Sequence, residues 1–122
     1  MRILLVDDEE ELVSTLAERL TLRGIEAEWV TSGETALKRA RENAYDLAVL
    51  DIKIPRISGI NLKKELQKID PRMKFIFMTG HGSEDDYLAG SKEAGMEYYL
   101  VKPVNIQTLI EKINSALDGG TP

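Results

Sequence analysis

Short apolar segments alternate along the chain with longer segments in which apolar residues recur every three or four positions. Four of the short segments are almost entirely apolar, which is typical of strands that are buried on both faces of a parallel sheet. These segments span residues 3–6, 47–50, 75–78 and 98–101. A further segment, 25–29, alternates apolar and acidic residues and is typical of a half-exposed edge strand. The pattern therefore predicts five strands.

The segments between the predicted strands have the apolar period of helices that are buried on one side. Ser32 and Ser58 are typical N-caps of the second and third helices. Gly24 marks the end of the first helix, and Pro71 follows the end of the third. Between Glu84 and Ala94 the apolar stripe is thin, so we expect this fourth helix to be the element that moves. The last helix has the clearest stripe, which consists of Ile106, Leu109, Ile110, Ile113 and Leu117.

Five alternating strand and helix units predict an α/β fold, a doubly wound parallel sheet with helices on both faces. The length of 122 residues is that of a single domain with one core. We expect residues 1–118 to form this domain. Residues 119–122 are glycine-rich and are interpreted as a tail or as the start of a linker.

Composition excludes several classes of function. The net charge of −5 argues against direct binding of nucleic acid, which normally requires a basic surface. No apolar stretch is long enough to span a bilayer, and the N-terminus does not have the pattern of a signal peptide. Without cysteine, disulfides and thiol catalysis are excluded. We therefore expect a cytoplasmic protein that does not bind membranes.

Polar residues follow the predicted strands where each one ends. Asp7 and Asp8 follow the first strand, Asp51 the third, Thr79 the fourth and Lys102 the fifth. Since ligand sites of open parallel sheets form beyond the carboxyl ends of the strands, we expect these side chains to converge. Two carboxylates about 4 Å apart repel each other by a few kcal/mol, which a divalent cation relieves. The oxygen ligands favour Mg²⁺, and the chain has no histidine or cysteine cluster for zinc.

Asp51 is the candidate nucleophile of this site. With Mg²⁺ and Lys102 neutralising the phosphoryl oxygens, an Asp51 oxygen can attack phosphorus in line and form an aspartyl phosphate. Thr79 can donate a hydrogen bond to one phosphoryl oxygen, and Lys102 can pair with another. We interpret residues 9–11, all glutamates, differently, as acids of a first helical turn that oppose the macrodipole.

The motifs stand in the order Asp7-Asp8, Asp51 with Pro55 and Gly59 after it, Thr79-Gly80 and Lys102-Pro103. This order resembles the receiver domain of bacterial two-component response regulators, and the resemblance covers essentially the whole chain. It implies a flavodoxin-like fold with strand order 2-1-3-4-5 and five helices. It also implies phosphotransfer to the aspartate from a sensor histidine kinase or a phosphotransfer protein. A downstream effector domain or protein is expected as well. A homodimer through the fourth helix, the fifth strand and the fifth helix is one option, and the sequence leaves the oligomeric state open.

The resemblance also implies the metal ligands. In the family pattern Asp8 and Asp51 bind Mg²⁺ directly, together with the backbone carbonyl of Lys53. Asp7 acts through water. The position of Lys53, two residues after the phosphorylated aspartate, also resembles one that tunes the rate of dephosphorylation.

Other positions match parts of the family switch. Thr79 and Lys102 are expected to hold the phosphoryl group, and the Lys102-Pro103 peptide bond is expected to be cis. Tyr99 matches the aromatic residue that turns inward when the threonine moves, although Tyr98, on the opposite face, competes for that role. His81 lies two residues after the threonine, at the second rate-tuning position, and is otherwise interpreted as an exposed loop residue.

These features predict a Mg²⁺-dependent phosphoacceptor that assists its own phosphorylation and dephosphorylation rather than an enzyme. One alternative is a phosphatase that passes through an aspartyl phosphate. Such an enzyme would need a second aspartate two residues after the nucleophile, where Lys53 follows Asp51. The other alternative is a constitutive interaction module that has lost phosphorylation. The intact set of acids, threonine and lysine argues against it.

Overall fold

The computed structural model describes residues 1–80 and 99–118. Five parallel strands form one sheet in the order β2-β1-β3-β4-β5, which confirms the expected strand order. The strands are β1 (Arg2–Val6), β2 (Glu26–Val30), β3 (Leu47–Asp51), β4 (Lys74–Thr79) and β5 (Tyr99–Val101). The helices in the described residues are α1 (Glu10–Leu22), α2 (Gly33–Glu42), α3 (Gly59–Ile69) and α5 (Ile106–Leu117). The helix expected between Glu84 and Ala94 lies outside these residues.

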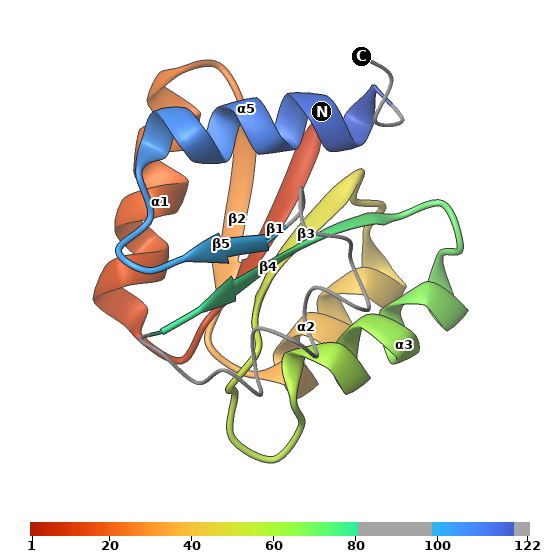
Figure 1. Cartoon of the computed structure of the whole chain (residues 1–122). Coiled ribbons are helices and arrows are strands. Elements are labelled where there is room, and N and C mark those ends of the chain that lie inside the picture. Colours follow the sequence, from red (N-terminus) through yellow and green to blue (C-terminus); the bar gives the residue numbers. More distant parts are fainter. Residues whose placement is uncertain (81–98, 119–122) are drawn as a thin grey trace.

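Helices cover both faces of the sheet, with α1 and α5 on one side and α2 and α3 on the other (Figure 1). Since successive strand residues point to opposite faces, each inner strand contributes to two apolar layers. Leu4 packs in the layer under α2 and α3 with Leu62, whereas its neighbour Leu5 packs in the layer under α1 and α5 with Leu109. This two-sided burial explains why the inner strands are almost entirely apolar in sequence.

The predicted ends of the helices agree with the structure. The Ser32 hydroxyl accepts a 3.1 Å hydrogen bond from the backbone N–H of Thr35, and Ser58 caps α3 in the same way. Helix α1 ends before Gly24, which has a φ of +82° that favours glycine. Within residues 1–80 and 99–118, no helix combines the length and the apolar character that crossing a bilayer requires.

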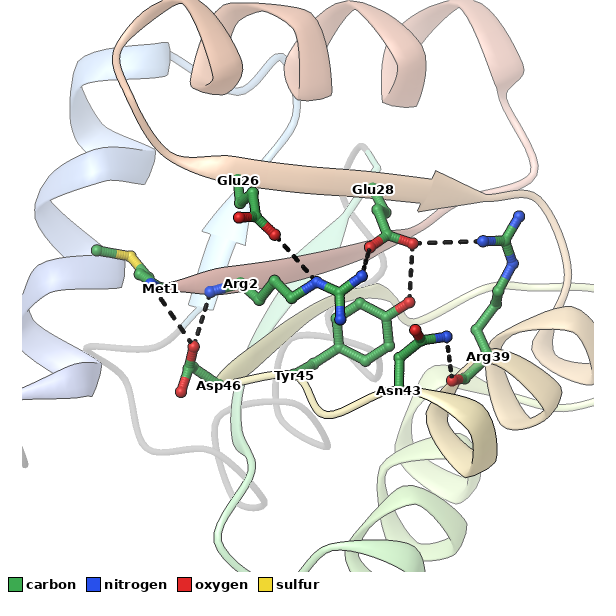
Figure 2. Close-up of polar contacts among 8 residues, drawn as sticks. All are labelled: Met1, Arg2, Glu26, Glu28, Arg39, Asn43, Tyr45 and Asp46. Atoms are coloured by element: carbon green, nitrogen blue, oxygen red, sulfur yellow. Dashed lines mark hydrogen bonds and ion pairs between the residues drawn. The ribbon is translucent and has the colours of Figure 1, made fainter.

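A group of charged and aromatic residues, which we name the Arg2 cluster, joins β1 and β2 to α2 at the amino ends of the strands (Figure 2). The Arg2 guanidinium lies 3.1 Å from Glu26 and 2.6 Å from Glu28. Glu28 also accepts a 3.0 Å hydrogen bond from the Tyr45 hydroxyl and lies 3.3 Å from Arg39 of α2. Burial and the Glu28 carboxylate raise the pKa of Tyr45 to about 12, so the hydroxyl remains a donor. Glu28 is therefore fixed by three groups.

Helix α3 begins directly against the backbone at the end of β3. A Cβ atom at Gly59 would overlap the carbonyl oxygen of Asp51, so no larger residue fits without a backbone shift. The Gly59 N–H also donates a 2.8 Å hydrogen bond to the carbonyl of Ile52. The position of Asp51 thus depends on the absence of a side chain at Gly59.

We predict that Gly59→Ala lowers the free energy of unfolding by about 2–3 kcal/mol, because the neighbouring atoms belong to the backbone and cannot rotate away. Gly80→Ala is the control, since a Cβ there has no atom of residues 1–80 or 99–118 within 4 Å, and its effect is expected to stay within about 0.5 kcal/mol. Urea denaturation of both variants measures the difference. Equal effects would contradict the packing described for Gly59.

Candidate functional site

Three carboxylates meet beyond the carboxyl ends of β1 and β3. Asp7 and Asp8 follow β1, and Asp51 is the last residue of β3. Each of the three offers an oxygen atom, and these oxygens lie within 4.8 Å of one another. Asp7 and Asp51 are buried, whereas Asp8 is exposed. The structure thus brings together the acids that the sequence placed at separate strand ends.

The ammonium group of Lys102 lies among these acids. Its Nζ atom is 2.7 Å from Asp7, 2.9 Å from Glu9 and 3.3 Å from Asp51, and its side chain is only 12% exposed. The backbone N–H of Lys102 donates a 2.8 Å hydrogen bond to the carbonyl of Thr79, so the end of β5 is joined to the end of β4. The peptide bond from Lys102 to Pro103 is cis, as the family pattern implied.

Glu9 is a member of the site that our interpretation of the sequence missed. It occupies the N-cap of α1, but its side chain makes no capping hydrogen bond. The carboxylate reaches Lys102 instead, 93 positions away in the chain. The backbone N–H of Glu9 donates a 2.9 Å hydrogen bond to the carboxylate of Asp7, so Glu9 lies beside this buried acid. Acids at a helix start are common, and nothing in the local pattern distinguishes this one.

Charge in the site is unbalanced toward the negative. Burial raises the pKa of both Asp7 and Asp51, and for Asp51 the neighbouring Asp7 charge raises it further, while Lys102 acts in the opposite direction on both. Burial alone would lower the pKa of Lys102, but its hydrogen bonds to Asp7 and Glu9 outweigh this and raise it. One ammonium group therefore faces several carboxylates, and an all-oxygen site with excess negative charge can hold a hard cation.

The remaining predicted residues lie around this centre, as far as the structure describes them. Thr79 ends β4 and is buried, one position beyond Met78, the register partner of Asp51. The Lys53 backbone N–H donates a 3.3 Å hydrogen bond to Asp51. Tyr99 is buried in the layer under α2 and α3. His81 and Tyr98 lie outside the described residues.

Comparison with protein families matches residues 3–114 to the response regulator receiver domain. The chain belongs to this family. It is thus the receiver domain of a two-component response regulator, and its cluster of aspartates is one that could bind a metal ion. The family match agrees with the resemblance inferred from the motifs.

The curated relatives are longer than this chain. The chain is 34% identical over 120 residues to the transcriptional regulatory protein GlrR of Escherichia coli K12, and the alignment covers 98% of this chain but 27% of GlrR. It is 38% identical over 116 residues to the transcriptional regulatory protein CpxR of Klebsiella pneumoniae, covering 95% of this chain and 49% of CpxR. The chain therefore spans half or less of the length of these curated relatives.

A solved receiver domain has the same fold. The CheY-like receiver domain from Methanospirillum hungatei superposes with a TM-score of 0.85 at 35% identity, covering 97% of this chain and 94% of that one. A response regulator from Burkholderia pseudomallei, solved with a phosphorylated aspartic acid, a calcium ion and citrate, superposes with a TM-score of 0.77 at 29% identity. That alignment covers 95% of this chain and 65% of the other.

We predict that Asp51→Asn stabilises the metal-free receiver domain, and that the gain depends on pH. Burial raises the pKa of Asp51 in the folded protein, so folding favours the protonated carboxyl. The stability that this protonation contributes is fully present below the unfolded pKa of Asp51, near 3.8, and is lost as the pH rises through its folded pKa. Near pH 3.8 and below, the two proteins should therefore differ little. At pH 7 the variant should melt several degrees higher, at about 4 °C for each kcal/mol gained.

Thermal unfolding in EDTA between pH 4 and pH 7 measures this difference. Asp46→Asn is the matched control, since the Asp46 side chain is 55% exposed and lies at the opposite end of the sheet. A gain for Asp51→Asn that is constant over this pH range would contradict the role assigned to burial.

Proposed function

We propose that Asp51 of the receiver domain accepts a phosphoryl group from a sensor histidine kinase or a phosphotransfer protein in a reaction that requires Mg²⁺. The observation that carries this proposal is the position of the Lys102 ammonium, 3.3 Å from Asp51, within a cluster of three further acids. The Lys102 ammonium and a cation held by the neighbouring aspartates would together provide the positive charge that phosphoryl transfer to Asp51 needs.

The proposed metal ligands are those of the family pattern, and the meeting of Asp7, Asp8 and Asp51 supports them. Asp8 and Asp51, with the backbone carbonyl of Lys53, would hold Mg²⁺, and Asp7 would act through water. The donor set consists of oxygen atoms alone, which suits a hard cation. Burial raises the pKa of Asp7 and of Asp51, so a bound cation would favour their charged forms. When bound, the ion neutralises phosphoryl oxygens. The calcium ion of the Burkholderia relative supports a divalent cation in this family.

The protein side chains carry the remaining steps. An Asp51 oxygen attacks phosphorus while the bond from phosphorus to the histidine nitrogen of the donor breaks, and the imidazole leaves with the electron pair. Thr79 and Lys102 then hold two phosphoryl oxygens. For this, Lys102 exchanges its contact with the Asp51 carboxylate for one with the new phosphoryl group. The phosphorylated aspartic acid of the Burkholderia relative supports this product.

The output follows from the connection between the site and β5. When Thr79 and Lys102 move toward the phosphoryl group, Tyr99 is proposed to adjust behind the threonine and to alter the surface of the fourth helix, β5 and α5. On β5, Val101 is 54% exposed and belongs to this surface. An effector domain or protein would read the change, directly or through a homodimer formed on the same surface. The length of the transcriptional regulators among the relatives supports a separate output domain.

We predict that acetyl phosphate and Mg²⁺ add one phosphoryl group to the receiver domain, as measured by intact mass. Asp51→Asn should add none, and EDTA should abolish the reaction. Asp46→Asn, the charge-matched control, should react like the wild type. A phosphatase would instead show multiple turnovers on a phosphomonoester, and a constitutive module would remain unmodified. Modification of the Asp51→Asn variant would contradict the proposal.

Lys53 is proposed to extend over the phosphoryl group and exclude the hydrolytic water. Lys53→Ala should therefore shorten the lifetime of the aspartyl phosphate by about threefold, or roughly 0.7 kcal/mol in the barrier to hydrolysis. Loss of label after removal of the donor measures this lifetime. Lys68→Ala on the exposed side of α3 is the control and should leave it unchanged. Equal lifetimes for wild type and Lys53→Ala would show that the Lys53 side chain does not influence the rate of hydrolysis.

A further inference from the structure

The Lys102 ammonium has as many carboxylate neighbours as it has protons to donate. Among the described residues, its Nζ atom contacts Asp7 at 2.7 Å, Glu9 at 2.9 Å and Asp51 at 3.3 Å. An ammonium group has three N–H donors and no acceptor. A phosphoryl oxygen that approaches Lys102 can therefore gain a close hydrogen bond only when one of these carboxylates gives up its contact.

The two aspartates are costly to separate from Lys102. Asp7 is fully buried, with its Oδ2 atom near the ammonium and its Oδ1 atom bonded to the backbone N–H of Glu9. Removing the partner of a buried charge is strongly unfavourable. The Asp51 side chain is only 6% exposed, and it exchanges its contact with Lys102 only as it takes up the phosphoryl group. Neither contact is therefore available while the phosphodonor is still intact.

Glu9 differs from both aspartates because its side chain lies in solvent. It is 63% exposed, and it makes no capping hydrogen bond to α1. The backbone of Glu9 is held by its hydrogen bond to Asp7, so the side chain can turn away while the backbone stays in place. An exposed ion pair contributes little to stability, since water can replace the lost contact. Rotation of Glu9 into solvent is thus the least costly way to free an N–H of Lys102.

We propose that Glu9 is the exchangeable partner of Lys102, which occupies the ammonium group in the resting site and leaves it when the phosphoryl group of the donor arrives. This proposal rests on the proposed function of Asp51. Glu9 acts through Lys102 and is a positioning residue. Because Glu9 competes with the donor for one N–H, it weakens donor binding. A small phosphodonor, which binds through little more than its phosphoryl group, has no further contacts to offset this competition, whereas a protein donor does.

The rate of phosphorylation by acetyl phosphate in the presence of Mg²⁺, followed by intact mass over a range of donor concentrations, tests this proposal. Glu9→Gln keeps the length of the side chain and removes its charge. It should lower the donor concentration that gives the half-maximal rate by about two- to fivefold, and change the rate at saturating donor by less than about twofold. Glu10→Gln is the matched control, the same change at the neighbouring exposed acid, and should alter either quantity by less than about 1.5-fold.

A second variant separates the contact with Lys102 from the negative charge of Glu9. Glu9→Asp keeps the charge but shortens the side chain by one methylene, which withdraws the carboxylate from Lys102 and favours capping of α1 instead. If the contact governs donor binding, Glu9→Asp should lower the half-saturating donor concentration as Glu9→Gln does. If repulsion of the donor by the charge alone were responsible, Glu9→Asp would behave like the wild type, and the exchange of partners would be excluded.

Binding of inorganic phosphate provides a measurement in which no phosphoryl group is transferred. A titration of the unphosphorylated protein in Mg²⁺, followed by phosphorus NMR, gives the Kd of phosphate. Since phosphate needs the same N–H of Lys102, Glu9→Gln should lower this Kd by about two- to fivefold, and Glu10→Gln should leave it within about 1.5-fold of the wild-type value.

Failure of this proposal can be distinguished from failure of the proposed function. If the wild type takes up no phosphoryl group from acetyl phosphate, both fail. If the wild type is phosphorylated but Glu9→Gln leaves the half-saturating donor concentration and the Kd of phosphate unchanged, the proposal for Glu9 alone is wrong. A fall in the rate at saturating donor, without tighter binding of donor or phosphate, would instead mean that Glu9 keeps its contact with Lys102 during transfer, which also overturns the exchange.

Discussion

One ammonium group shared among carboxylates from distant parts of the chain is the interaction on which the site depends. Lys102 contacts Asp7 after β1 and Asp51 at the end of β3, and its own backbone is bonded to the end of β4. These contacts bring the ends of four strands to one point. These contacts do not balance the negative charge of the site, because burial disfavours the charged forms of Asp7 and Asp51 and a single ammonium group faces both. The fold therefore maintains an unfavourable concentration of negative charge, which a bound cation can relieve.

The backbone around this point leaves the site little freedom to shift. Gly59 begins α3 against the carbonyl of Asp51, so Asp51 is positioned by a helix start as well as by its strand. The backbone N–H of Lys102 is hydrogen-bonded to the carbonyl of Thr79. In the proposed switch, a displacement of either residue would therefore be transmitted into β5, the strand that carries Tyr99.

The sequence was sufficient to predict the parallel strands and the convergence of Asp7, Asp8 and Asp51, because the strand period and the polar residues at strand ends are local properties. The strand order, by contrast, came from the resemblance to receiver domains. The contact between Glu9 and Lys102 could not be predicted, since an acid at a helix start has an ordinary local explanation. The contact of Arg2 with Glu28 joins residues 26 positions apart, and the close approach of Gly59 to Asp51 depends on how α3 begins against β3. Such contacts depend on how the elements dock, which the periodicity of each element does not specify.

The division of the core into two layers has a consequence for how such domains can diverge. Leu4 and Leu5 are neighbours in β1, yet they belong to different layers and pack against different helices. A change of side-chain volume in one layer can be compensated by its own helices without disturbing the other. Such domains can therefore accept substitutions under one pair of helices while the packing under the other pair is kept.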